Sequence, residues 1–92
     1  MANAIVTVKV MPDSPETDLG ALETKIKAVI ADFAGEGETK TEIEPVAFGL
    51  KAIKIIFVMD EAQGSPDPVA EKVESFDDVN SAEIVDVRRA LG

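Results

Sequence analysis

The chain has 92 residues, with 18 Asp and Glu against 9 Lys and Arg, so that its formal net charge is −9. That length is typical of one domain, residues 1–92, and the absence of His and Cys excludes Ser-His-Asp triads, cysteine nucleophiles and His-Cys zinc sites within the chain. The acidic balance argues against direct nucleic-acid binding, because contact with phosphates needs a basic surface.

The first predicted element is a strand over residues 4–11, where β-branched side chains dominate and alternate between two faces. One face carries three valines: Val6, Val8 and Val10. Pro12 ends the strand, because proline has no N–H group to donate to a β-ladder.

An amphipathic helix of about four turns is predicted next. Its apolar residues recur at helical spacing and form one stripe: Leu19, Leu22, Ile26, Val29, Ile30 and Phe33. Asp18 suits the N-cap of this helix, and Gly35 suits its C-cap.

Two further strands are predicted over residues 39–46 and 50–59. The first alternates weakly and has Pro45 near its end, which is typical of an edge strand. The second has apolar residues on both faces, one of which also carries Lys54, and this is typical of a central strand. Phe48 and Gly49 lie in the turn between the two strands.

A short helix and a last strand complete the chain. The helix is indicated by apolar residues at i, i+4 and i+7: Val69, Val73 and Phe76. Either Ser65 or Asp67, each followed by a proline, offers an N-cap for it. The last strand is predicted over residues 79–87, and residues 88–92 form a C-terminal tail.

The predicted order of elements is β-α-β-β-α-β, which is the split βαβ plan of an α+β, ferredoxin-like sandwich. Its sheet has four antiparallel strands in the order 4-1-3-2. Both helices cover one face of that sheet, and the other face stays open.

No segment of the sequence indicates a membrane span or an export signal. The most apolar run, residues 53–59, is interrupted by Lys54 and is much shorter than the roughly 20 residues that cross a bilayer. The first residues lack a basic region followed by a long apolar one. We therefore expect a cytoplasmic protein that does not bind membranes.

The many carboxylates predict a solvated acidic surface and no catalytic, metal or cofactor site. They do not follow the offsets of a calcium loop, which also needs a glycine at its bend. The glycines at residues 35–37 follow a helix, whereas phosphate-binding glycine loops stand between a strand and a helix.

Two features stand apart from this acidic background. Phe48, beside Gly49, is either a core residue or an exposed apolar anchor for a partner protein. Arg88 and Arg89 are the only arginines in the chain. They form either a solubilising tail or a cationic probe for an anionic or metal-binding site on a partner.

Three segments together resemble the archaeal elongation factor 1-beta family, the guanine-nucleotide exchange factors of translation elongation factor 1-alpha. They are residues 5–12 (I-V-T-V-K-V-M-P), 45–50 (P-V-A-F-G-L) and 86–92 (D-V-R-R-A-L-G). The resemblance covers nearly the whole chain. It implies a ferredoxin-like fold and a non-covalent role in translation elongation, in which GDP leaves the GTPase and GTP replaces it, without an enzymatic reaction.

The resemblance also implies which residues contact the partner. In eukaryotic relatives, a phenylalanine in the motif that matches residues 47–49 contacts the GTPase, and a lysine near the C-terminus disturbs its Mg²⁺ and phosphate region. The matching residues here are Phe48 and Arg89. Arg89 keeps the positive charge of that lysine but is planar and bulkier, and Arg88 is a second candidate for the same role.

This topology places the turn with Phe48 and the end of the last strand at opposite ends of the sheet. We therefore expect the partner to embrace the domain lengthwise, across two domains of its own. Two other functions remain open for the same fold. One is a regulatory or small-molecule-binding module, and the other is an assembly domain that pairs its edge strands into an oligomer.

Overall fold

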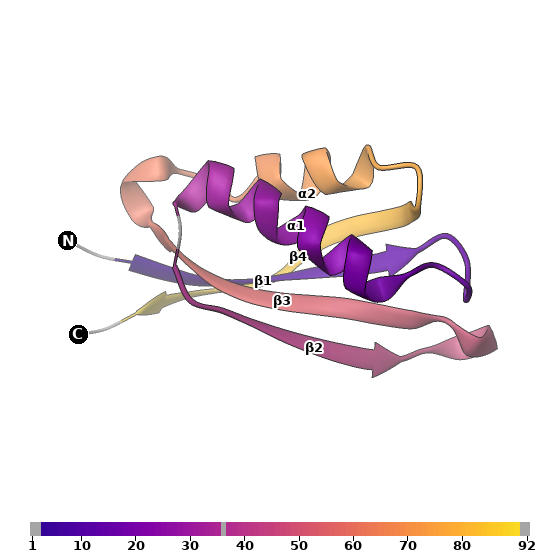
Figure 1. Cartoon of the computed structure of the whole chain (residues 1–92). Coiled ribbons are helices and arrows are strands. Elements are labelled where there is room, and N and C mark those ends of the chain that lie inside the picture. The colour runs from indigo at the N-terminus through magenta and orange to yellow at the C-terminus, as the bar shows by residue number, and fades with distance from the viewer. Residues whose placement is uncertain (1–2, 36, 91–92) are drawn as a thin grey trace.

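The computed structural model describes residues 3–35 and 37–90, which form four strands and two α-helices. In chain order these are β1 (Asn3–Pro12), α1 (Leu19–Ala34), β2 (Thr39–Pro45), β3 (Lys51–Asp60), α2 (Asp67–Glu74) and β4 (Val79–Ala90). Two 3₁₀ turns flank β3: η1 (Ala47–Gly49) and η2 (Glu61–Gln63). The strands form one antiparallel sheet in the order β2-β3-β1-β4, with both helices on one face (Figure 1). The predicted ferredoxin-like fold and strand order are confirmed.

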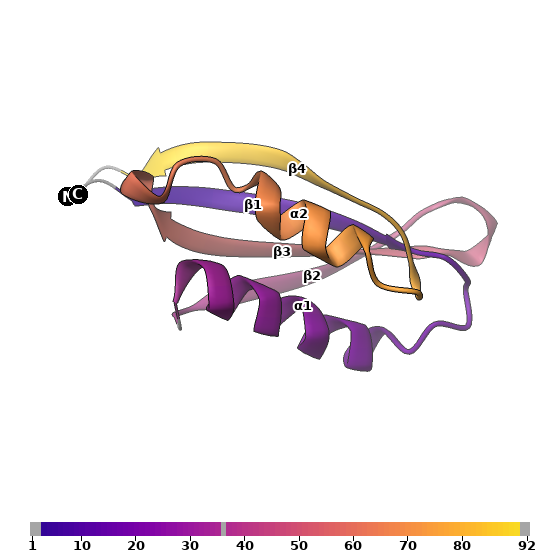
Figure 2. The same cartoon turned by 90° about the horizontal axis from the view of Figure 1, so that it is seen from above.

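The core lies between the sheet and the helices, and alternate residues of β1 and β3 supply its lower layer. None of these side chains is more than 6% exposed: Ala4, Val6, Val8, Val10, Ile53, Ile55, Phe57 and Met59. The helices add buried residues above them: Leu22, Ile26 and Ile30 from α1, and Val69, Ala70 and Val73 from α2. α1 packs on the β3 side of the sheet and α2 on the β4 side (Figure 2). Strand β3 is central and β2 is an edge strand with no buried residue, as predicted.

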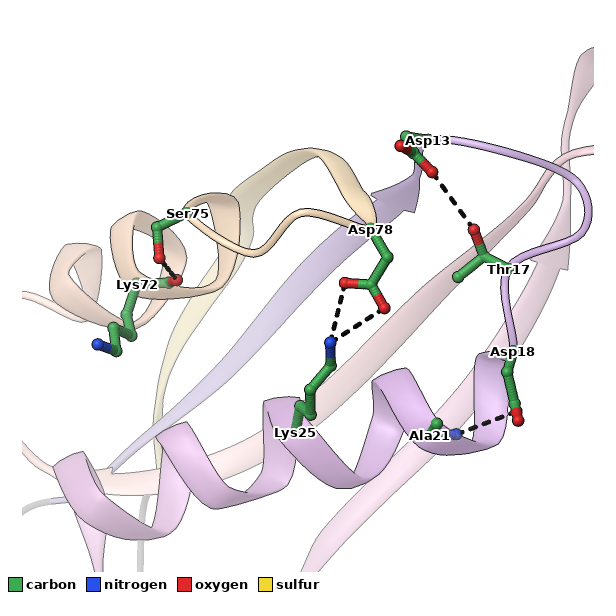
Figure 3. Close-up of polar contacts among 8 residues, drawn as sticks. All are labelled: Asp13, Thr17, Asp18, Ala21, Lys25, Lys72, Ser75 and Asp78. Carbon is green, nitrogen blue, oxygen red and sulfur yellow. Dashed lines mark hydrogen bonds and ion pairs between the residues drawn. The ribbon is translucent and has the colours of Figure 1, made fainter.

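Local hydrogen bonds fix where the helices begin and end. Asp18 is the N-cap of α1, and its Oδ1 accepts a hydrogen bond from the backbone N of Ala21 at 3.1 Å (Figure 3). Gly35 is the C-cap, with a φ of 83° that favours glycine. The N-cap of α2 is Pro66, which provides no side-chain hydrogen bond, so the prediction of Ser65 or Asp67 as the N-cap is wrong. The hydroxyl of Ser65 accepts instead from the backbone N of Asp67, the first residue of the helix, at 3.1 Å.

A second set of contacts ties α1 to the connection between α2 and β4. Lys25 Nζ lies 3.0 Å from both carboxylate oxygens of Asp78 (Figure 3), and it also lies 5.1 Å from the centre of the Phe76 ring. The backbone O of Asp78 accepts from the N of Asp13 at 3.1 Å. These contacts join the two helical segments to the end of β1.

Strand β4 continues through residues 88–90, so the expectation that they belong to a C-terminal tail is wrong; residues 91–92 lie outside the described part of the chain. The physical reason is that backbone groups make a β-ladder, so pairing with β1 continues to Ala90, opposite Asn3, although the side chains of residues 88 and 89 are charged. Val85 is skipped in the register with β1 and forms a bulge, which adds one residue to the strand and shifts its alternation by one position. The bulge therefore places Val87 and Arg89 on the same face as Ala82 and Ile84.

No helix within residues 3–35 and 37–90 is long and apolar enough to cross a membrane.

Substitution of Ile55 tests the packing of this core. Ile55 is fully buried in β3, so Ile55→Ala should lower the free energy of unfolding by about 2–5 kcal/mol. Ile43 in the neighbouring β2 is 46% exposed, and Ile43→Ala, the matched control, should change it by less than about 1 kcal/mol. Urea unfolding followed by circular dichroism measures both. Equal losses would contradict the placement of β3 in the core and β2 at its edge.

Candidate partner-binding site

Phe48 lies at the tip of the β2–β3 hairpin, and it is 94% exposed. Two backbone hydrogen bonds close the loop around it, from the N of Val46 to the O of Leu50 at 2.9 Å and from the N of Leu50 to the O of Ala47 at 3.3 Å. The alternative of a core phenylalanine is therefore wrong. An aromatic ring that is this exposed is available as an anchor for a partner protein.

The hairpin also holds Phe48 in a left-handed backbone conformation, with φ 62° and ψ 30°. Among residues 3–35 and 37–90, it is the only residue other than glycine with a positive φ. Bulky side chains rarely adopt this conformation, because their Cβ approaches the backbone too closely. Gly49 follows with φ 77° and completes the turn. Strained backbone conformations cluster at functional sites, which makes Phe48 a candidate for contact with a partner.

Arg88 and Arg89 lie near the end of β4, and their side chains are 76% and 68% exposed. Arg88 is opposite Ile5 of β1, on the open face of the sheet. Arg89 is opposite Ala4, whose side chain is in the core, so Arg89 lies on the face that carries the helices. Adjacent residues of a strand point to opposite faces. One flat contact surface therefore cannot engage both arginines from the same side.

Each arginine makes an ion pair through its Nε atom. Arg88 Nε donates to Oδ2 of Asp86 at 2.8 Å, within the same strand. Arg89 Nε donates to Oε1 of Glu61 in η2, also at 2.8 Å. Both contacts use Nε, and no described residue accepts a hydrogen bond from the Nη groups of either guanidinium, which can bind a further carboxylate or phosphate. Glu61 was missed by sequence reasoning, since it is 28 positions from Arg89 and belongs to no periodic pattern.

The phenylalanine and the arginines lie at opposite ends of the molecule, as predicted. Asn3 of β1 is opposite both Asp60, the last residue of β3, and Ala90, the last residue of β4. The arginines are therefore near the end of β3, whereas Phe48 precedes its start. The described part of the chain measures 42 × 20 × 18 Å. Figures 1 and 2 show the hairpin at one end of the long dimension and both termini at the other.

An ion pair on the open face holds the base of the hairpin together. Lys54 Nζ of β3 lies 2.5 Å from Oε2 of Glu44 in β2. The hydrogen bond from Lys54 lowers the pKa of the Glu44 carboxyl, and the same bond raises the pKa of the Lys54 ammonium. Both groups are therefore charged at neutral pH, next to the loop that carries Phe48.

The described residues contain no group of three or more Asp or Glu side chains that is arranged to hold a metal ion. The described site has an exposed apolar ring, that of Phe48, at one end of the sheet and two exposed cations, Arg88 and Arg89, at the other. This arrangement can bind and displace groups on a partner without making or breaking a covalent bond.

Substitution of Phe48 by glycine tests the strained conformation. Phe48→Gly should raise the free energy of unfolding by about 0.5–1 kcal/mol, because relief of the left-handed strain exceeds the added entropy of the unfolded chain. Phe48→Ala keeps a Cβ at the same φ and removes an exposed ring, so it should leave stability almost unchanged. Urea unfolding compares the two variants. Destabilisation by glycine would contradict the strain, and destabilisation by alanine would show that the ring supports the fold.

The EF-1 guanine nucleotide exchange domain matches residues 5–90 of the chain. Several archaeal proteins named elongation factor 1-beta are similar over almost their full length. The protein of Methanosphaera stadtmanae is 38% identical over 91 residues, which cover 99% of this chain and 100% of the relative. The protein of Methanobrevibacter smithii is 39% identical over 94 residues, with the same two coverages. That of Pyrococcus abyssi is 44% identical over 88 residues, covering 95% of this chain and 94% of the relative. The chain therefore belongs to the elongation factor 1-beta family of guanine nucleotide exchange domains.

Proposed function

We propose that this chain acts in the cytoplasm as one exchange-factor domain that promotes GDP release from, and GTP reloading of, translation elongation factor 1-alpha. Membership of the exchange-domain family supports the class of reaction. The observation that carries the assignment to particular residues is the strained, 94% exposed Phe48, with exposed arginines at the other end of the same sheet.

The mechanism is thermodynamic linkage between two ligands of the GTPase. A factor that binds the nucleotide-free GTPase more tightly than the GDP-bound form must weaken GDP binding by the same ratio. GDP then leaves faster, and GTP, when it is the more abundant nucleotide, refills the site and releases the factor. No residue of the factor has to transfer a proton, which is consistent with a chain that has no His and no Cys.

The residues have separate roles in this mechanism. Phe48 anchors the factor in an apolar pocket of the GTPase, and Gly49 permits the turn that presents the ring. Arg89 reaches the region of the bound Mg²⁺ and phosphates, where a guanidinium competes with the metal for carboxylate and phosphate oxygens. Arg88 points to the open face and binds a second acidic group on that side.

The separation of the two ends determines how the partner approaches. A single compact contact cannot cover both ends of a molecule that is 42 Å long. The GTPase therefore embraces the factor lengthwise, and two of its domains each take one end. The acidic body of the factor, with its net charge of −9, favours approach to a basic surface on the GTPase, an effect that weakens as salt is added.

Release of fluorescent GDP from preloaded elongation factor 1-alpha tests this function. Wild-type factor should accelerate release, and Phe48→Ala and Arg89→Ala should each reduce the acceleration by about tenfold or more, the effect expected of interface hot spots. Two controls should resemble wild type. Ile43→Ala removes another exposed apolar side chain, and Lys27→Ala removes another exposed, ion-paired cation.

The outcomes separate the function from the site. If wild-type factor does not change the rate of GDP release from a GTPase that still binds nucleotide, the proposed function is wrong. If wild type is active and both Phe48→Ala and Arg89→Ala are equally active, the function stands and the site assignment is wrong.

The alternative of a small-molecule-binding module has one feature in its favour. A groove of about 790 Å³ lies between α1 and α2, with Val29, Phe33 and Phe76 among its lining residues. Neither Phe48 nor either arginine lines this groove, so that function would leave the strained hairpin unexplained. Unchanged GDP release together with ligand-dependent stabilisation of the fold would favour this alternative.

A further inference from the structure

We propose that Glu61 is a positioning residue for Arg89, which holds the guanidinium in the place from which it engages the anionic site of the GTPase. The inference rests on the proposed exchange function. It assigns a role to a residue that does not itself touch the partner.

The first support is the geometry of the contact between the two side chains. Oε1 of Glu61 accepts from Nε of Arg89 at 2.8 Å. The carboxylate is therefore bound to the guanidinium nitrogen nearest the aliphatic part of the arginine side chain. The two Nη groups, which bind carboxylates and phosphates in a fork, donate to no other residue in the described part of the chain and can bind the partner. Glu61 can therefore orient Arg89 without blocking it.

The second support is that Glu61 is mounted on an anchored turn. Asp60 Oδ1 caps η2 by accepting from the backbone N of Ala62 at 2.8 Å. On the other side, the amide of Gln63 donates to the backbone O of Phe33, near the end of α1. Strand β3 and helix α1 thus hold the turn from both sides. The side chain of Glu61 is also the less exposed of the pair, 33% against 68% for Arg89.

The third support is the contrast with the neighbouring arginine. Arg88 is paired with Asp86 at the same 2.8 Å, but both residues belong to β4, two positions apart. That local pair links Arg88 only to its own strand. The pair between Glu61 and Arg89 joins β4 to the turn that follows β3, at the same end of the sheet, and so fixes Arg89 relative to the rest of the fold.

The contact with Glu61 reduces the conformational entropy that the Arg89 side chain loses when the factor binds the GTPase. An arginine side chain without a partner samples many rotamers. Restricting it to one rotamer at an interface costs conformational entropy, and this cost weakens the complex. An exposed ion pair contributes only modestly. Loss of Glu61 should therefore slow exchange by about two- to fivefold, which is the factor that corresponds to about 1 kcal/mol or less.

The test is a double-mutant cycle with GDP release as the readout. Glu61→Ala should reduce the acceleration of release by about two- to fivefold in the wild-type background and have no effect in the Arg89→Ala background. Glu61→Gln, which keeps an oxygen that can accept from Nε, should lose less than Glu61→Ala. The unfolding midpoint of each variant, measured in urea, should stay close to that of wild type.

Glu23→Ala is the matched control, because it removes a carboxylate of similar exposure from another ion pair, that with Lys27; it should leave exchange unchanged. The inference is overturned if Glu61→Ala resembles wild type, if it accelerates exchange, or if it slows exchange equally in the Arg89→Ala background. Inactive wild-type factor would instead overturn the proposed function on which the inference rests.

Discussion

The register of β1 with its two neighbours is the constraint on which the rest of the structure depends. Because side chains alternate along a strand, burying Val6, Val8 and Val10 against the helices leaves Ile5 and Lys9 on the other face. A slip of one residue would exchange the two faces and destroy the core. The same register sets the positions of residues in β4, including the two arginines.

That constraint produces an elongated, rigid domain with an exposed aromatic ring at one end and two arginines at the other. The pairing of β1, β3 and β4 runs along the sheet between the Phe48 hairpin and the arginines, with two register shifts between β1 and β4. A sheet that is packed against two helices does not bend easily. The distance between Phe48 and the two arginines is therefore fixed in the free protein, before a partner binds. In the proposed mechanism, binding energy gained at one end therefore acts on the partner at the other.

Much of this fold could be predicted from the sequence because periodicity and capping are local signals. The caps Asp18 and Gly35 and the edge position of β2 follow from such signals, and the strand order follows from the order of elements and the right-handed crossover rule. The site was less accessible to prediction. The exposure and positive φ of Phe48 depend on how the whole hairpin closes. The last residues of β4 include two charged side chains that give no apolar alternation, and the contact of Arg89 with Glu61 joins segments with no shared pattern.

The central claim is that one molecule of factor must present both ends to the same GTPase. The most direct test mixes the Phe48→Ala and Arg89→Ala variants, each of which retains one intact end, and follows release of fluorescent GDP from elongation factor 1-alpha. The mixture should accelerate release by no more than the sum of the two variants measured separately. Restoration of the wild-type rate by the mixture would contradict the account, because it would show that the two ends act from separate molecules.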